Sequence, residues 1–371
     1  MQAAVDVAIP SPVSSPSESI SKRPAMERNI ALDAFRGFIM LMLCASGFGF
    51  GALARDPRFA AIAAQFDHVA WEGAVFWDLI QPAFMFMVGA AMPFALAKRE
   101  AEGAAFGANF RHVAARSFRL LLLSQILMCI SAGRLNFQLI NVLAQMAFTY
   151  LFCFLILQLS FRAQVVVAAL ILAGHSALFL AFPPGFSQTG NIGAVIDRFL
   201  LGRNYSGHYV TINFVTSIVT TLAGAWAAQL LMSRRTAGRK MKILAACAAG
   251  CFAAGLALAP VIPLVKRIWT ASFTLYSTGW VLLMLIAFYW LVDVRGWRRA
   301  AFPIVVVGMN SIFIYSVHQV LQGWINRAVG VFTGKFEFIG ALAPVAQATA
   351  VLAVMWYLCY WLYQRKIFFK L

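Results

Sequence analysis

Long apolar runs separated by short charged segments are the dominant pattern along this chain of 371 residues. A helix needs roughly 20 mostly apolar residues to cross about 30 Å of hydrocarbon. Ten segments fit this description, the third of them being short for a span. They run from Ile30 to Leu53, Ala74 to Ala97, Ser117 to Ser131, Leu139 to Leu159, Ala163 to Phe182, Ile212 to Met232, Met241 to Leu264, Trp269 to Val292, Phe302 to Trp324 and Ile339 to Leu362. The pattern predicts an all-α, polytopic membrane bundle of about ten transmembrane helices.

The first 28 residues differ from the rest of the chain because they are rich in Ser and Pro and contain no long apolar run. A segment of this composition buries too little apolar surface to fold. It also lacks the apolar core of a signal peptide. We therefore predict a disordered cytoplasmic tail at residues 1–28 and a single transmembrane domain at residues 29–371.

Composition excludes an ordinary soluble protein, because 62% of the residues are hydrophobic and only 12% are charged, against about a quarter charged in soluble domains. The net charge of +17 would suggest nucleic acid in a soluble chain. Here the basic residues lie between apolar runs, so we predict no nucleic-acid partner and interpret them as cytoplasmic loop charges. With a cytoplasmic N-terminus, 21 of the 30 Lys and Arg residues fall inside and nine outside. The basic residues alternate between the two sides loop by loop, which predicts ten spans with both termini in the cytoplasm.

Ionisable residues at the ends of spans are the first functional candidates, since a charge in hydrocarbon is costly. The chain has only 13 acidic residues and five histidines. Asp67, His68, Glu72 and Asp78 nevertheless fall within twelve positions at the predicted outer end of the second span. A histidine with nearby carboxylates can supply a proton acceptor and a group that orients it. The six cysteines form no CxxC pair and no metal site is predicted.

Two further polar groups lie at or within predicted spans. Asp33 and Arg36 are three residues apart on one helix face, which suits either a structural ion pair or substrate binding. In GMNSIFIYSVHQV, helical spacing relates Asn310, Ser311, Tyr315 and His318, so Ser311, Tyr315 and His318 fall roughly on one helix face. A polar stripe inside a span usually faces the interior of the bundle, so we predict that these residues line a cavity.

Four segments of the chain resemble, in the same order, the landmarks of the transmembrane acyltransferases related to heparan-α-glucosaminide N-acetyltransferase. They are NIALDAFRGFIMLML, FDHVAWEGAVFWDLIQPAFMFMVGAAMPFAL, IPLVKRIWTASFTLYSTGW and GMNSIFIYSVHQV. The resemblance covers nearly everything from Arg28 to about Gln322. Within the family, the chain resembles the bacterial members, which lack the lumenal N-terminal domain. The resemblance implies an acyltransferase domain at residues 29–371 and a multi-pass location in the bacterial cytoplasmic (inner) membrane.

The resemblance also assigns site residues. The family's catalytic histidine before a W-x-G stretch falls on His68, and its Asp-Leu-x-x-Pro falls on Asp78, Leu79 and Pro82. Its LDxFRG falls on Leu32 to Gly37, and its late Asn-Ser and His fall on Asn310, Ser311 and His318. The chain departs from the family at Ala31, where a Ser is common, and at Ser46 or Gly47, one of which replaces an Asn of the lysosomal enzyme. These departures leave the acyl-transfer class intact, but neither an identical substrate nor identical chemistry follows from the resemblance.

The resemblance implies transfer of an acetyl group from cytosolic acetyl-CoA to an amino-sugar or glycan acceptor on the far side. His68 is predicted to act as general base, with acyl transfer through His68 itself as the other route, and Asp78 to orient it. The predicted substrate-binding residues are Asp67, Trp71, Glu72, Asn310 and His318, and the predicted acetyl-CoA clamps are Arg36, Arg116 and Arg119. The predicted partners are the lipid bilayer, acetyl-CoA, the acceptor and a second copy in a homodimer. A transporter or flippase is the alternative, because polar residues within a helical bundle also suit a substrate pathway.

Overall fold

The computed structural model describes residues 29–369, and helices are the only regular elements in this range. The predicted tail at residues 1–28 therefore lies outside the described residues. The α-helices are α1 (Ile30–Cys44), α2 (Ala60–Ala63), α3 (Ile80–Ala101), α4 (Phe106–Ala132), α5 (Val142–Leu157), α6 (Phe161–Ala181), α7 (Ile192–Leu201), α8 (Asn213–Met232), α9 (Ala237–Leu258), α10 (Ala271–Phe288), α11 (Arg298–Met309), α12 (Ser311–Thr333) and α13 (Ala343–Gln364). The all-α fold is confirmed.

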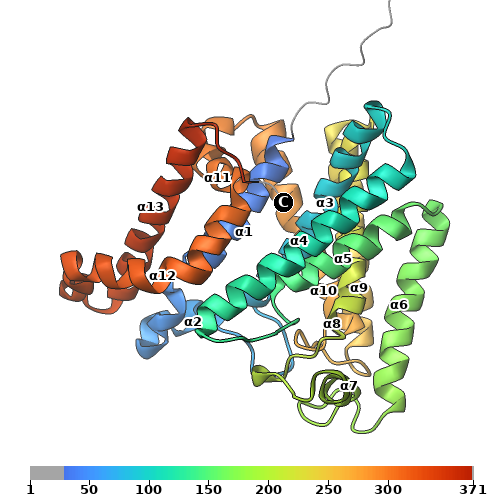
Figure 1. Ribbon diagram of the computed structural model, residues 1–371, viewed down its shortest axis with the longest axis horizontal. Coiled ribbons are helices and arrows are strands. Elements are labelled where there is room, and N and C mark those ends of the chain that lie inside the picture. Colours follow the sequence, from blue (N-terminus) through green and yellow to red (C-terminus); the bar gives the residue numbers. More distant parts are fainter. Residues whose placement is uncertain (1–28, 370–371) are drawn as a thin grey trace, which may run out of the picture.

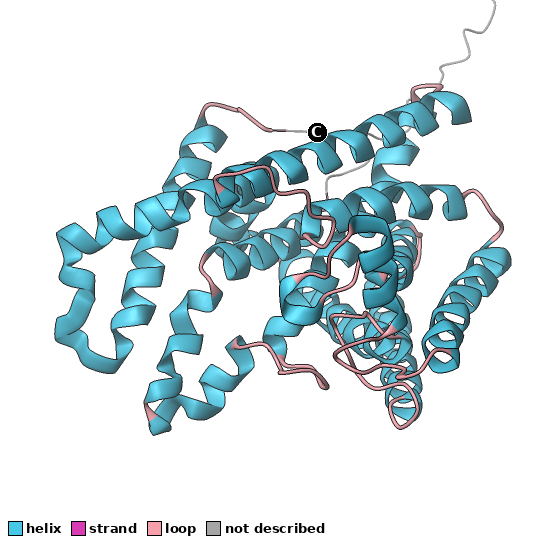
Figure 2. Cartoon of the chain, turned by 60° about the horizontal axis from the view of Figure 1, so that its bottom comes forward, coloured by secondary structure: helices cyan, strands magenta, loops and turns pink. Residues whose placement is uncertain are grey.

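The helices form a bundle from which one pair projects. In Figure 1, α3, α4, α5, α8 and α10 occupy the middle, α6 lies on one side, and α12 and α13 extend on the other. The longer loops gather at the lower end, which faces the viewer in Figure 2. They are joined there by hydrogen bonds such as Gly73 N to Leu264 O at 2.8 Å and Trp71 Nε1 to Phe186 O at 3.0 Å. This end, far from α11 and the start of α1, carries the candidate site.

Within the described residues, eight helical segments are long and apolar enough to cross a membrane. One of them, Ser311–Gln364, has 54 residues and contains both α12 and α13, while the apolar α5 is shorter than the rest. The protein is therefore a multi-pass helical membrane protein. The count of ten spans and the cytoplasmic side of the termini stay predictions.

The first predicted span, Ile30–Leu53, falls within the apolar segment Ile30–Arg55, but the helix in it is not continuous. Its helix ends at Cys44 rather than at Leu53, and the chain continues through a left-handed Ser46 (φ 48°) into a 3₁₀ segment, Gly47–Arg55. At Gly47 (φ +62°) an added Cβ would lie 2.8 Å from the Phe66 ring. The glycine permits both the turn and this close approach. Hydropathy alone does not register either requirement.

The ninth predicted span, Phe302–Trp324, is also two elements rather than one helix. The break falls at Asn310 (φ −121°, ψ 38°), between α11 and α12. Its amide donates to Ile367 O at 3.1 Å and accepts from Phe369 N at 3.1 Å. The break precedes Ser311, so the predicted face of Ser311, Tyr315 and His318 lies within a single helix, α12, and Asn310 caps the beginning of that helix.

The third predicted span, Ser117–Ser131, was too short. The helix α4 begins at Phe106 and has 27 residues. Its first turns carry Arg111 and Arg116, which the prediction treated as loop residues. Long arginine side chains can lie along an apolar helix and still place their charged ends in a polar region, so a charged stretch did not mark the end of the helix.

Two helix crossings bring backbones together at glycines. A Cβ on Gly37 of α1 would overlap the Ile304 carbonyl of α11, and a Cβ on Gly89 of α3 would overlap the Thr221 carbonyl of α8. Small residues allow such close packing in membrane bundles. The second crossing fixes α3, the helix that follows Asp78.

Candidate active site

Asp78 is a buried carboxylate at the beginning of α3. It lies in the 3₁₀ turn Phe76–Leu79 and is 1% exposed. Its Oδ2 accepts from Val75 N at 3.3 Å, while its own N–H donates to Val75 O at 3.0 Å. A helix N-terminus favours a negative charge. The local fold therefore holds this carboxylate in one place.

His68 contacts this carboxylate directly. Its Nδ1 lies 2.6 Å from Asp78 Oδ1, and its side chain is 40% exposed. An ionised carboxylate only accepts hydrogen bonds, so Nδ1 carries the proton and Nε2 of the neutral ring keeps a lone pair. Among the described residues Nε2 has no hydrogen-bond partner. The structure thus brings together His68 and Asp78, with a basic nitrogen left open.

Lys266 is the third member of the cluster, and the sequence analysis assigned it no role. It comes from the loop between α9 and α10, is 5% exposed, and places Nζ 3.3 Å from Asp78 Oδ1 and 3.4 Å from His68 Nδ1. Burial lowers the pKa of Lys266 to about 8. The sequence did contain a hint of this role, because Lys266 belongs to IPLVKRIWTASFTLYSTGW, one of the four segments that carry the family resemblance.

Hydrogen bonds join the two loops that carry His68 and Lys266. Gly73 N donates to Leu264 O at 2.8 Å, and the Arg267 guanidinium donates to Ala70 O. These bonds connect the segment after His68 to the segment around Lys266. The Phe66 ring packs edge-on against Phe76 at 5.4 Å. The site is therefore assembled from two chain segments that are far apart in the sequence.

Trp71 extends the site toward the segment between α6 and α8. Its indole donates to Phe186 O at 3.0 Å, and the Arg267 guanidinium lies 5.9 Å from its ring. The His208 ring meets it edge-on at 6.5 Å. The other predicted substrate residues of this loop, Asp67 and Glu72, are exposed, and Asp67 Oδ1 accepts from His68 N at 2.8 Å. Asp67 thus contacts His68 directly, whereas Trp71 connects this loop to the segment between α6 and α8.

The remaining predicted substrate residues lie in other parts of the bundle. Asn310 is buried at the α11–α12 junction, where its amide binds the backbone of residues 367 and 369. His318 lies on α12, and its buried Nδ1 has no hydrogen-bond partner among the described residues. No contact joins either residue to His68 or Asp78 in this part of the chain. A role in substrate binding stays a prediction for both.

The predicted acetyl-CoA clamps occupy two separate helices. On α1, an Arg36 amino group lies 2.6 Å from Asp33 Oδ1 and Arg36 Nε donates to Gly308 O at 2.7 Å. On α4, Arg116 donates to the Tyr150 hydroxyl at 3.2 Å, whereas Arg119 is exposed. Their role in binding a donor stays a prediction.

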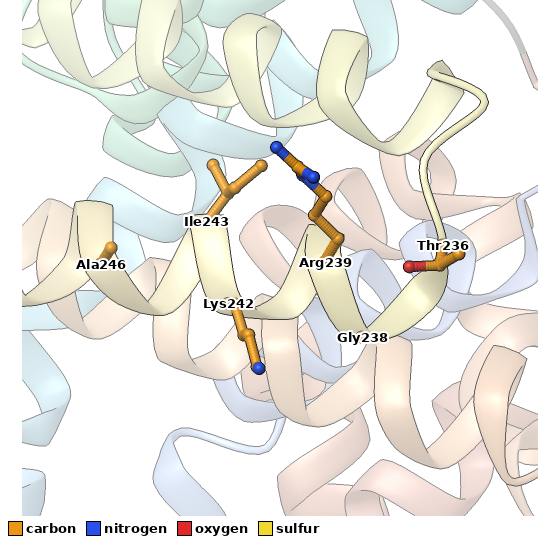
Figure 3. A pocket seen from close by; sticks show the side chains of 6 residues that line it. All are labelled: Thr236, Gly238, Arg239, Lys242, Ile243 and Ala246. Carbon is orange, nitrogen blue, oxygen red and sulfur yellow. The ribbon is translucent and has the colours of Figure 1, made fainter.

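A basic pocket of about 600 Å³ lies at the beginning of α9. It is lined by Thr236, Gly238, Arg239, Lys242, Ile243 and Ala246, as Figure 3 shows. Because α9 has 22 residues and each adds about 1.5 Å, the beginning of α9 is roughly 30 Å from the end that leads to Lys266. From the sequence, the two cations of this pocket, Arg239 and Lys242, are interpreted only as loop charges. Residues 29–369 contain no group of three His, Cys, Asp or Glu side chains arranged to hold a metal ion.

Comparison with known proteins adds a relation over nearly the whole chain. No protein-family model matches the sequence. The chain is 25% identical to the heparan-alpha-glucosaminide N-acetyltransferase of Homo sapiens over 92% of its own residues, and 23% identical to that of Mus musculus over 97%. It spans 59% and 63% of the length of these two proteins. The relation expected from the four sequence segments is thereby confirmed.

Proposed function

We propose that this chain, which is related to heparan-alpha-glucosaminide N-acetyltransferase, is a membrane acetyltransferase with its active site at His68. The proposed donor is acetyl-CoA, and the proposed acceptor is an amine or hydroxyl of an amino sugar or glycan. The observation that carries the proposal is the 2.6 Å contact between His68 Nδ1 and Asp78 Oδ1, which leaves Nε2 open on a 40% exposed side chain. This is the geometry that a general base requires.

In the proposed reaction, His68 Nε2 removes a proton from the acceptor as the acceptor's nitrogen or oxygen attacks the thioester carbonyl. The new C–N or C–O bond forms, the C–S bond breaks, and the CoA thiolate takes the proton from the imidazolium. Asp78 fixes the tautomer of His68 and balances its positive charge during the reaction. In the other route, Nε2 attacks the thioester first and carries the acetyl group.

The donor would approach from the opposite end of the bundle. The proposed contacts for the phosphates of CoA are Arg36, Arg116 and Arg119. A guanidinium group can donate two parallel hydrogen bonds to the oxygens of one phosphate. The basic pocket of Arg239 and Lys242 adds positive charge at that end. We place this end in the cytoplasm of a bacterial cell and His68 on the periplasmic side of the inner membrane. A homodimer is part of the same proposal.

The test is acceptor-dependent release of CoA thiol by purified protein in liposomes, given acetyl-CoA and a panel of amino sugars. His68→Ala should reduce the rate by about 10²- to 10⁴-fold, the usual contribution of a general base. His112→Ala, which removes a histidine of α4 outside the site, is the matched control and should retain the rate.

Two outcomes would redirect the proposal. Acceptor movement across the liposome membrane without thiol release would support the transporter alternative. Accumulation of acetylated His68 after incubation with acetyl-CoA alone, detected by mass spectrometry, would support the acyl-histidine route.

A further inference from the structure

We propose that Lys266 is a positioning residue that keeps His68 unprotonated by giving the buried Asp78 carboxylate a second, cationic partner. The inference deepens the proposed function and rests on it. It assigns to Lys266 the task of setting which proton state of the imidazole meets the acceptor.

The contacts of Asp78 Oδ1 carry the argument. Both His68 Nδ1, at 2.6 Å, and Lys266 Nζ, at 3.3 Å, lie on this one oxygen. A carboxylate that is 1% exposed needs a counter-ion, because a buried, unpaired charge is costly. With Lys266 protonated, the charge of Asp78 is already balanced, and His68 can remain neutral while it donates through Nδ1.

Without Lys266, the same carboxylate would be left with His68 as its partner. It would then favour the imidazolium, since an opposite charge within about 4–6 Å stabilises the charged form. An imidazolium has no lone pair on Nε2 and cannot accept a proton. Lys266 therefore protects the basic form of His68, and during reaction it also promotes return of the proton to the leaving thiolate.

The backbone on both sides of Lys266 forms a turn that hydrogen bonds hold in place. The Lys266 carbonyl accepts from Trp269 N at 3.0 Å, and Thr270 N donates to Val265 O at 3.2 Å. Thr270 Oγ1 also donates to Pro263 O at 2.7 Å. Val265, Ile268 and Trp269 are each 0% exposed. The ammonium thus has little freedom to leave the carboxylate.

The other charged and titratable groups around Lys266 are few. Arg267 follows it in the chain and extends over the rings of Trp71 and Tyr209, at 5.9 Å from each. Its positive charge acts in the same direction as that of Lys266. Asp67 acts in the opposite direction but is exposed and binds the backbone N–H of His68. The buried ammonium is therefore the dominant cation at the carboxylate.

The test measures the proton state of His68 without requiring acetyl transfer. Diethyl pyrocarbonate acylates unprotonated imidazole, and mass spectrometry of the peptide containing His68 gives its modification rate between pH 5 and pH 8. In Lys266→Met the half-maximal pH should move upward by about one unit, so that modification at pH 6 slows several-fold. Lys266→Arg should keep the profile of the unmodified protein, and exposed His208 in the same samples is the internal control.

An unchanged or downward-shifted profile in Lys266→Met would overturn the inference. Lys266→Gln repeats the test with a polar neutral side chain if Lys266→Met does not fold. Absence of CoA release by the unmodified protein would refute the proposed function alone, because the His68 profile would still report the action of Lys266.

Discussion

Asp33 and Asp78 are both acidic residues near the beginning of a helix with basic partners, yet the two ends of the molecule use them differently. Asp33 pairs at 2.6 Å with Arg36, one turn further along α1, and Arg36 Nε also binds Gly308 O of α11. Asp78 instead contacts His68 and Lys266, which arrive from two separate loops. The Asp33–Arg36 ion pair lies within one helical turn and Arg36 connects α1 to α11, whereas Asp78 brings two separate loops to a single oxygen.

The difference lies in the partner groups. Guanidinium stays protonated at all ordinary pH values, so the Asp33–Arg36 pair has no basic atom to offer. Imidazole changes its charge in the physiological range, and His68 leaves Nε2 open. A buried carboxylate therefore indicates chemistry only when one of its partners can exchange a proton at an accessible atom.

The largest expected effect comes from changing Asp78. In Asp78→Asn, the amide no longer fixes the Nδ1–H tautomer of His68 and cannot balance an imidazolium. We expect the rate of CoA thiol release to fall by about 10²- to 10⁴-fold, as when the orienting acid of a catalytic triad is replaced. Asp197→Asn is the matched control, since Asp197 is also a buried carboxylate (1% exposed) but binds Thr211 N. An equal loss in both variants would contradict an orienting role for Asp78.

The second expected effect is a pH dependence of stability from Lys266. Its pKa is lowered from 10.5 to about 8 by burial, so the folded state binds the proton less tightly than the unfolded state. The resulting penalty is fully present below pH 8 and is relieved between pH 8 and 10.5. The free energy of unfolding should rise by up to about 3 kcal/mol over this window.

Thermal unfolding in detergent at several pH values measures this effect. Lys266→Met is compared at each pH, because every other titrating group is common to both proteins. The difference between the two midpoints should change across the window from pH 8 to 10.5, and a constant difference would contradict the prediction.

A smaller effect is expected at the Asp33–Arg36 pair. Asp33→Asn keeps the shape of the side chain but removes the charge that pairs with Arg36. The free energy of unfolding should fall by about 1 kcal/mol, because the pair is partly exposed and near the surface value for ion pairs. Chemical unfolding in detergent measures this change. The pH profile of CoA release should stay as in the unmodified protein, and a shifted profile would show that the two ends are coupled.

The smallest effect is expected at the exposed pair of Asp56 and Arg58. Their atoms lie 2.7 Å apart, and the Arg58 side chain is 77% exposed. The neighbouring guanidinium lowers the pKa of Asp56, but solvent screens this interaction. Arg58→Ala should leave the thermal midpoint and CoA release unchanged within measurement, so a clear drop would indicate a function for this loop.

Local patterns located most of the helices but not their breaks. Apolar length identified α3, α5, α6, α8 and α10 near their observed positions, because each has to be long and apolar to cross a bilayer. The breaks after Cys44 and at Asn310 depend on contacts with distant residues: Phe66 in the first case, Ile367 and Phe369 in the second. Hydropathy contains no information about such contacts.

For the candidate site too, the sequence indicated some of the residues and missed others. Closeness along the chain was sufficient to group His68 with Asp78, and the structure places the two in contact. It also grouped Glu72 with them, although that side chain is exposed. Lys266 appeared in the charge pattern only as one outer cation among nine, with nothing to distinguish it from its neighbour Arg267.

Chain composition and periodicity thus specify a multi-pass helical membrane protein with His68 and Asp78 close together, since burial in lipid and spacing along one segment are local properties. The tertiary fold decides which cation reaches Asp78. The Gly73–Leu264 hydrogen bond and the turn around Thr270 bring Lys266, rather than Arg267, to the carboxylate. That choice depends on the packing of segments far apart in sequence, which buries Lys266 and leaves its neighbour Arg267 partly exposed.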